Sequence, residues 1–217
     1  MGISGRAVFP DGAAGQLPEQ TPHPRVRLPE ALLLRLPCGA GHLSTYVIEG
    51  TLDDGQIVVD AEDAGTVRLI LNGASITSST SAAIYVKQAD QTVISLEAGT
   101  ENVVTDAKEY VFASEEDEPS GTIFSKDDLS INGDGKLVVN ANYKDGIVSR
   151  DDFIVTGGNI EINAEDDGIV GRDLFAMRDA TINVTANGDG VKSSNDEDAE
   201  KGNIVLQSGS LHVTAGA

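Results

Sequence analysis

Cysteine, tryptophan and aromatic residues in general are scarce in this chain of 217 residues, which has one cysteine, no tryptophan and 4% aromatic residues. Because Cys38 is the single cysteine, an internal disulfide is excluded, and the redox compartment cannot be read from it. The lack of tryptophan and tyrosine rows disfavours the flat platforms on which crystalline cellulose stacks. The three histidines are scattered, so neither a histidine metal cluster nor a Ser-His-Asp triad is indicated.

Basic residues are also few. Beyond residue 43 the sequence carries 32 acidic residues against 11 lysines and arginines, a net charge of −21. Such a surface repels nucleic acid and anionic membranes, so neither is an expected partner. No apolar stretch is long enough to span a membrane. The charge suits the binding of cations, or a protein kept soluble outside the cell.

Residues 1–43 differ in composition from the rest, because they hold six of the seven prolines and four of the arginines. We expect this head to be irregular or disordered, or to result from a mis-called gene start or a frameshift. Met1–Arg6 lacks the basic region of a signal peptide, and the residues before Cys38 do not fit a lipoprotein cleavage site. The chain therefore offers no convincing signal peptide.

A repeat dominates the C-terminal half. Asp-Gly occurs at Asp145-Gly146, Asp167-Gly168 and Asp189-Gly190, 22 residues apart each time, and an aliphatic residue follows each pair. A period in this range is typical of a solenoid, in which each copy is one coil. The interval therefore predicts coils of about 22 residues.

The pattern between the Asp-Gly pairs is that of strands. Aliphatic residues alternate with polar ones over 160–164, and the same alternation returns over 182–186 and 211–215. We predict that 44–217 is an all-β domain, a single-stranded right-handed parallel β-helix. Residues 108–120 interrupt the repeat and are expected to form an exposed acidic loop.

The repeat has no counterpart of its next Asp-Gly pair after Ala217. The domain is therefore expected to be C-terminally truncated, with a last coil that has no cap. The open strand edges of such a coil would allow self-association with other chains.

Stacked coils would place the repeated aspartates in a column about 5 Å apart, the spacing of neighbouring strands. Two carboxylates at that distance repel by about 1 kcal/mol in water, and by more near a surface of low dielectric constant. Calcium prefers such oxygen ligands, and a second acidic column, with Asp128 and Asp152 beside it, is expected close by. The candidate calcium ligands are Asp127, Asp145, Asp151, Asp152, Asp166, Asp167, Asp173 and Asp189. The alternative is that Asp-Gly only makes a good turn, with glycine in the left-handed region.

Basic residues and one tyrosine accompany these columns. Lys126, Arg150 and Arg172 are expected to form a basic column, which either neutralises the neighbouring aspartates or contacts an anionic sugar. Lys192 is a candidate general base if calcium lowers its pKa. Tyr143 is the exposed aromatic residue beside the first column. The candidate carbohydrate-binding residues are Lys126, Tyr143, Lys144, Arg150, Arg172 and Lys192.

Several motifs resemble one known family. These are the run Gly121–Leu129 with Ile131-Asn132-Gly133 after it, Asn142–Ile147, Gly55–Asp60 and Leu71-Asn72-Gly73. Over about residues 45–217 the chain is similar to the bacterial carbohydrate-binding β-helix domains typified by a clostridial cell-surface polysaccharide-binding protein. The resemblance implies a fold similar to pectate lyases, bound calcium, binding of cellulose or of acidic plant glycans such as polygalacturonate, and an extracellular or cell-surface location.

Three functions remain open on the sequence. The first is calcium-dependent, non-catalytic binding of a polysaccharide. The second is a calcium-dependent polysaccharide lyase, and the third is a structural adhesin stalk in which the columns serve stability alone.

Overall fold

A computed structural model describes residues 25–28, 31–36, 43–61, 65–112, 114 and 118–216. Within these residues the regular structure consists of strands, and every strand pairing is parallel. The expected all-β class with parallel strands is therefore confirmed. No helix in the described part of the chain has the length and apolar character needed to cross a membrane.

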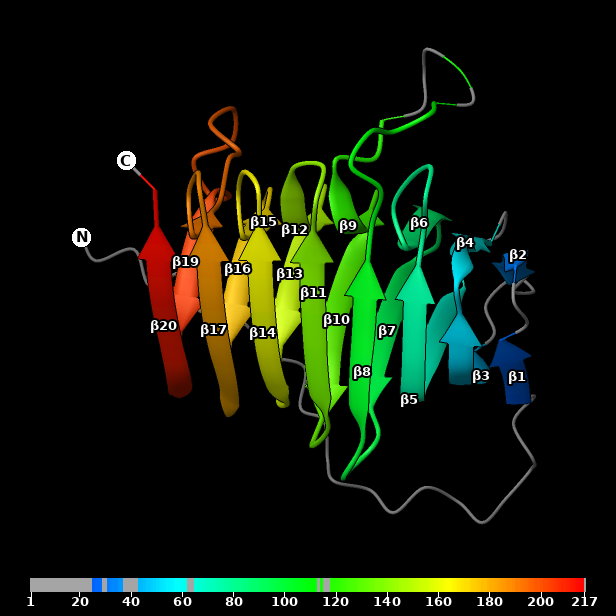
Figure 1. The fold of residues 1–217 in the computed structure, drawn as a ribbon. Coiled ribbons are helices and arrows are strands. Elements are labelled where there is room, and N and C mark those ends of the chain that lie inside the picture. Colours follow the sequence, from blue (N-terminus) through cyan, green and yellow to red (C-terminus); the bar gives the residue numbers. More distant parts are fainter. Residues whose placement is uncertain are drawn as a thin grey trace.

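The strands form three stacks along a common axis (Figure 1). One stack is a separate sheet of seven strands, whose bounds are β2 (Ala31–Leu36), β4 (Asp54–Asp60), β6 (Ile84–Gln88), β9 (Gly121–Ser125), β12 (Asp145–Ser149), β15 (Ile169–Gly171) and β18 (Val191–Lys192). The second stack contains β7 (Gln91–Leu96), β10 (Asp128–Gly133), β13 (Asp152–Val155), β16 (Leu174–Met177) and β19 (Asn203–Leu206). The third contains β8 (Glu101–Thr105), β11 (Lys136–Ala141), β14 (Asn159–Ala164), β17 (Ala180–Ala186) and β20 (Gly209–Ala215).

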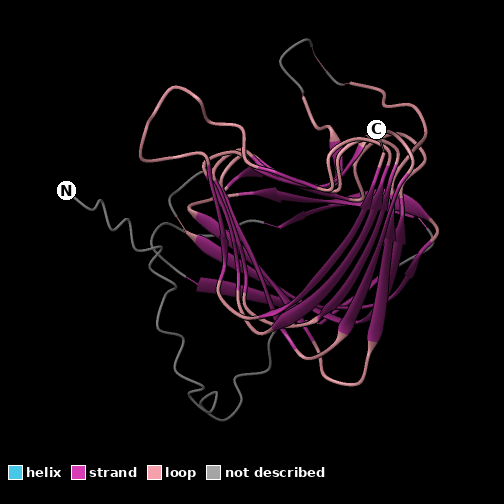
Figure 2. Ribbon diagram, turned by 90° about the vertical axis from the view of Figure 1, so that its left-hand side faces the viewer, coloured by secondary structure: helices cyan, strands magenta, loops and turns pink. Residues whose placement is uncertain are grey.

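The second and third stacks are joined through one long bent strand, β5 (Thr66–Thr77). Its first half pairs with β7 and its last residues pair with β8. The bend falls at Gly73, whose φ of 72° is easily reached by glycine. Figure 2 shows that the three stacks enclose a roughly triangular interior.

The register confirms the predicted repeat. Ile147 pairs with Ile169, and Ile169 with Val191, at the predicted interval. Ile160, Ile182 and Leu211 follow one another in the third stack, also as predicted. Aliphatic side chains of successive coils thus lie over one another in the interior. The rings of Phe153 and Phe175 pack there at a tilt of 37°, with centroids 5.6 Å apart. The right-handed sense of the winding stays a prediction.

The solenoid begins earlier than the sequence predicted. Within the head that was expected to be irregular, β1 (Arg25–Leu28) pairs with β3 (Leu43–Leu52), and β2 pairs with β4. Both segments alternate or are rich in aliphatic residues, but the surrounding prolines obscured the strand pattern. The other residues of 1–43 lie outside the described part of the chain.

A second apolar cluster lies on the outer side of the seven-stranded sheet. It contains Tyr85, Phe124 and Val148, against which Tyr110 of the acidic loop packs. The loop over 108–120 is therefore partly buried rather than wholly exposed, although Phe112 in the same loop is exposed. Glu115, Glu116 and Asp117 of that loop lie outside the described residues.

Candidate functional site

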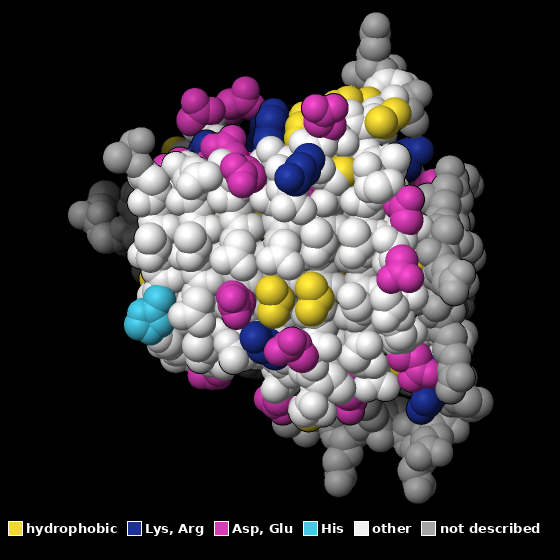
Figure 3. All heavy atoms as spheres, in the orientation of Figure 1, with side chains coloured by type: hydrophobic (Ala, Val, Ile, Leu, Met, Phe, Trp, Pro, Cys, Tyr) yellow, Lys and Arg dark blue, Asp and Glu magenta, His cyan; other side chains and the backbone are white. Residues whose placement is uncertain are grey.

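The Asp-Gly pairs lie at or just before the starts of β12, β15 and β18. We call Asp145, Asp167 and Asp189 the first column. Successive members are linked, because the backbone N–H of Asp167 donates to Oδ1 of Asp145 over 3.3 Å and that of Asp189 donates to Oδ1 of Asp167 over 2.8 Å. In the orientation of Figure 3, charged side chains gather along the upper edge of the third stack, where these turns lie. Hydrogen bonds within the protein thus stabilise part of the negative charge.

The glycines of this repeat have a packing role. Neither Gly146 nor Gly168 nor Gly190 has a positive φ, so the alternative in which glycine supplies a left-handed turn is wrong. A Cβ atom on Gly168 would lie 2.2 Å from Cγ1 of Val184 and 2.6 Å from the carbonyl oxygen of Gly190. The chain turns so close to the coil interior that only glycine fits.

Lys192 neutralises two members of the first column. Its Nζ lies 3.0 Å from Oδ2 of Asp167 and 3.7 Å from Oδ2 of Asp189. The hydrogen bond to Asp167 and the negative charge of that group raise the pKa of Lys192. The lysine is therefore protonated at neutral pH and does not have the lowered pKa that a general base requires. Asp166 is exposed near the same edge.

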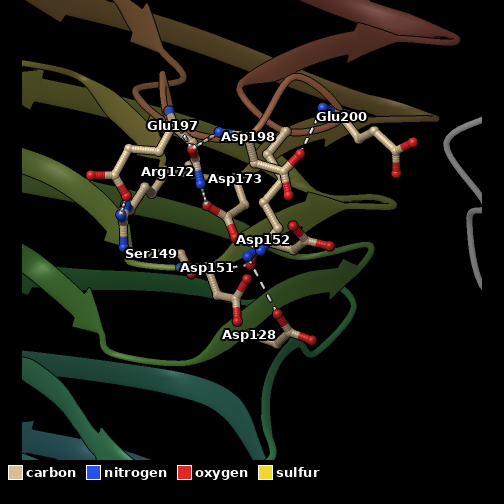
Figure 4. A network of polar contacts seen from close by, with 12 residues as sticks. Asp128, Ser149, Asp151, Asp152, Arg172, Asp173, Glu197, Asp198 and Glu200 are labelled. Atoms are coloured by element: carbon tan, nitrogen blue, oxygen red, sulfur yellow. Dashed lines mark hydrogen bonds and ion pairs between the residues drawn. The ribbon is translucent and has the colours of Figure 1, made fainter. Parts of the chain in front are cut away.

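A tighter group of carboxylates lies in the second column, which we define as Asp127, Asp151 and Asp173 with Asp128 and Asp152 beside them. One carboxylate oxygen from each of Asp128, Asp151 and Asp152 lies within 4.8 Å of the other two. We call these three residues the Asp128 cluster (Figure 4). Burial is the largest cause of the raised pKa values of Asp128, Asp151 and Asp152. The charges of neighbouring aspartates raise the pKa of Asp152 further.

The register explains how this cluster forms. Leu129 of β10 pairs with Phe153 of β13, so the residues before them, Asp128 and Asp152, lie side by side. The backbone N–H of Asp152 donates to Oδ1 of Asp128 over 3.3 Å. The sequence placed Asp128 beside the second column but not among the candidate ligands, although the doublet Asp127-Asp128 returns as Asp151-Asp152.

The ends of the second column have protein partners. Oδ2 of Asp127 accepts the N–H of Ala89 over 2.8 Å. Asp173 is buried. It accepts a hydrogen bond from Asn195 and forms an ion pair with Lys201. Burial alone would raise the pKa of Asp173, but these hydrogen bonds lower it below its ordinary value. Within the second column, the negative charges of the Asp128 cluster are offset least by protein partners.

The basic column is present, but its ion-pair partners differ from those expected. Lys126 and Arg150 lie 3.8 and 3.6 Å from Glu118, and Arg172 lies 3.7 Å from Glu197. The expectation that the neighbouring aspartates neutralise this column is therefore wrong for the ion pairs that the structure describes. Both glutamates belong to loops between coils, whose path the repeat does not determine.

Tyr143 is less exposed than predicted. It is half-buried and stacks on Tyr110, with ring centroids 4.1 Å apart and an angle of 20° between the rings. Nζ of Lys144 lies 5.2 Å from the centroid of the Tyr143 ring. The hydroxyl of Tyr110 donates to the buried Asp106 over 2.7 Å. Sequence reasoning missed Tyr110 and Asp106, because neither belongs to the repeated motif.

The chain is thus built of stacked parallel strands, and its turns carry two acidic columns and a basic one. A family model described as carbohydrate-binding domain-containing protein matches residues 40–217. The chain belongs to this family.

One relative and one solved structure support the assignment. A protein of the same description from Acetivibrio thermocellus is 44% identical over 120 residues, which make up 55% of this chain and 42% of the relative. The match thus spans less than half the length of that relative. A solved structure described as the polysaccharide lyase-like protein from C. thermocellum, gadolinium derivative, matches with a TM-score of 0.79 and 37% identity, over 84% of this chain and 73% of that one.

Proposed function

We propose that the chain is a calcium-dependent, non-catalytic polysaccharide-binding domain, built as a right-handed parallel β-helix and located outside the cell or on its surface. The family and the polysaccharide lyase-like neighbour support polysaccharide binding in general. The observation that carries the calcium dependence is the Asp128 cluster, where three carboxylates crowd together beside a row of cationic side chains.

The donor set of the Asp128 cluster fits calcium. Calcium binds carboxylate and carbonyl oxygens in flexible arrangements of six to eight ligands. Asp128, Asp151 and Asp152 would supply carboxylate oxygens, and the bound cation would offset the mutual repulsion that contributes to their raised pKa values. In the first column, by contrast, the oxygens of Asp167 already have protein donors.

The glycan proposed for this edge is acidic, of the polygalacturonate class. A calcium ion would reduce the repulsion between the acidic protein and a uronate carboxylate. Arg150 and Arg172 are partly exposed, and their ion pairs with loop glutamates are long. Such surface pairs contribute little stability, so a sugar carboxylate could replace the glutamates at small cost.

The lyase alternative gains no support from Lys192. Its ion pairs with the first column keep it protonated, whereas proton abstraction needs a basic group. We therefore expect no rise in ultraviolet absorbance when the protein is mixed with polygalacturonate and calcium. An enzyme-dependent rise, which marks unsaturated lyase products, would contradict the non-catalytic assignment.

The proposed function is tested by retention of the protein on immobilised polygalacturonate. We expect retention in calcium and its loss in EDTA. Replacing Arg150 and Arg172 together by glutamine should weaken binding by roughly tenfold, because charge-assisted hydrogen bonds are lost. The matched control is Lys136→Gln, which removes a cation that pairs with Glu101 and Glu161 on the third stack, and it should be retained like the wild type.

Retention that persists unchanged in EDTA would refute the calcium bridge. Retention on cellulose but not on polygalacturonate would refute the acidic glycan. If calcium raised the melting temperature while no glycan of an array bound, a structural stalk would be the better description.

A further inference from the structure

A shallow cavity of about 350 Å³ lies at the opposite end of β10 from Asp128. Arg68 and Ile70 of β5 line it together with Asn132 of β10. The exposed carboxylates of Glu97 and Asp134, in the turns after β7 and β10, lie at its rim. The volume is at the lower end of the range for small-ligand sites.

Arg68 differs in its ion pairing from the other arginines whose side chains the structure describes. Arg25, Arg150, Arg172 and Arg178 each lie 3.6 to 3.7 Å from a carboxylate oxygen. Arg68 makes no such pair with any described residue, and its buried Nε has no hydrogen-bond partner. In a chain with 35 acidic residues, a buried guanidinium nitrogen without an acceptor among the described residues is unusual. No described residue holds the Arg68 guanidinium by an ion pair, so the group can turn toward an acceptor in the cavity.

The walls of the cavity are held by the backbone. The N–H groups of Asp134 and Gly135 both donate to the carbonyl oxygen of Leu96, and the N–H of Glu97 donates to that of Leu71. Gly133 has a φ of 101°, and a Cβ atom there would lie 2.2 Å from the oxygen of Leu96. The two turns are therefore packed directly on each other, and the backbone at the rim is positioned before any ligand arrives.

The chemistry of the lining matches a neutral sugar. A sugar hydroxyl both donates and accepts, and the cavity offers donors in Arg68 and acceptors in Glu97 and Asp134, with the amide of Asn132 able to do both. Ile70 adds an apolar wall for the C–H face of the ring. A uronate is disfavoured, because two carboxylates face one guanidinium in a chain of net charge −20.

We propose that this cavity is a second glycan subsite that binds a neutral pyranose unit through its vicinal hydroxyls, independently of calcium. The inference rests on the proposed polysaccharide-binding function and extends it to an uncharged sugar at a separate place. The acidic columns would then hold a uronate-rich segment while the cavity holds a neutral unit.

The test is calorimetric titration of the full chain, in EDTA, with β-1,4-linked hexasaccharides of glucose, xylose and mannose. We expect at least one of them to bind the wild type, and Arg68→Gln to weaken that binding about tenfold or more. Lys87→Gln removes an exposed positive charge away from the cavity and should bind like the wild type. Retention on polygalacturonate in calcium should be unchanged in both variants.

A second measurement does not depend on the folding of a variant. Amide chemical shifts of the wild type, followed during the same titration, should change at Asn132, at Asp134 and at Ser95, which also lines the cavity. Binding of none of the three hexasaccharides, shift changes confined to other surfaces, or equal affinities for Arg68→Gln and wild type would each overturn the subsite. Loss of polygalacturonate retention with intact hexasaccharide binding would refute only the acidic-glycan proposal.

Discussion

Gly168→Ala is expected to lower the free energy of unfolding by about 3 kcal/mol or more, at the upper end of what overpacking of a core costs. The new methyl group would lie 2.2 Å from Cγ1 of Val184 and 2.6 Å from the backbone oxygen of Gly190. The side chain can shift, but the oxygen belongs to the next coil and accepts the N–H of Ile169 over 3.1 Å. Relief of the clash therefore requires two coils to separate. Thermal unfolding should show a decrease in melting temperature of roughly 6 to 12 °C.

Two companion variants separate the causes of this loss. Gly99→Ala places a methyl group in open space at a φ of 74°, so it should cost only the strain of the left-handed region, about 1 to 2 kcal/mol. The double variant Gly168→Ala with Val184→Ala removes the side-chain clash and leaves the backbone clash. Its loss in free energy of unfolding should therefore be smaller than the sum of the losses of the two single variants. A Gly168→Ala protein as stable as Gly99→Ala would contradict the packing role.

The part of the fold that follows the repeat could be predicted from the sequence. Ile160, Ile182 and Leu211 occupy equivalent places in successive coils, because the same alternation and the same turn residues return at each copy. Such a period carries information on both register and coil length. The proline-rich head lacks it, and β1 and β2 were missed for that reason.

The partners of the charged columns were harder to predict, because they come from loops inserted between coils. Lys201 reaches Asp173 from the loop that precedes β19, and Glu118 approaches Arg150 from the loop that precedes β9. Neither contact follows from the period. The role of the glycines was also misjudged, because Asp-Gly is a frequent turn dipeptide, and its close approach to the coil interior is visible only in three dimensions.

The second large effect is expected from cation binding at the Asp128 cluster. Calcium at about 100 times its dissociation constant should raise the free energy of unfolding of the cation-free protein by roughly 2.7 kcal/mol, provided that it binds the folded state alone. Asp151→Asn should reduce this gain sharply, because affinity depends on the number of charged ligands. Asp189→Asn removes an exposed carboxylate from the first column and should leave most of the gain. Thermal unfolding of the three proteins, in EDTA and in calcium, compares the two columns directly.

The pH dependence of the same cluster provides an independent check. Asp128, Asp151 and Asp152 have native pKa values above that of an ordinary aspartate. Between the ordinary and the raised value the folded protein therefore binds more protons than the unfolded chain, and the contribution of these groups to stability falls as the pH rises through that window. In EDTA, the wild type should lose stability relative to Asp151→Asn as the pH rises toward neutrality, by about 1 kcal/mol for one removed repulsion. In calcium the order should reverse, since the wild type then holds the cation more tightly. A cation-free Asp151→Asn protein that is less stable than the wild type at neutral pH would show that the carboxylate is satisfied within the protein, and the cation site would have to lie elsewhere.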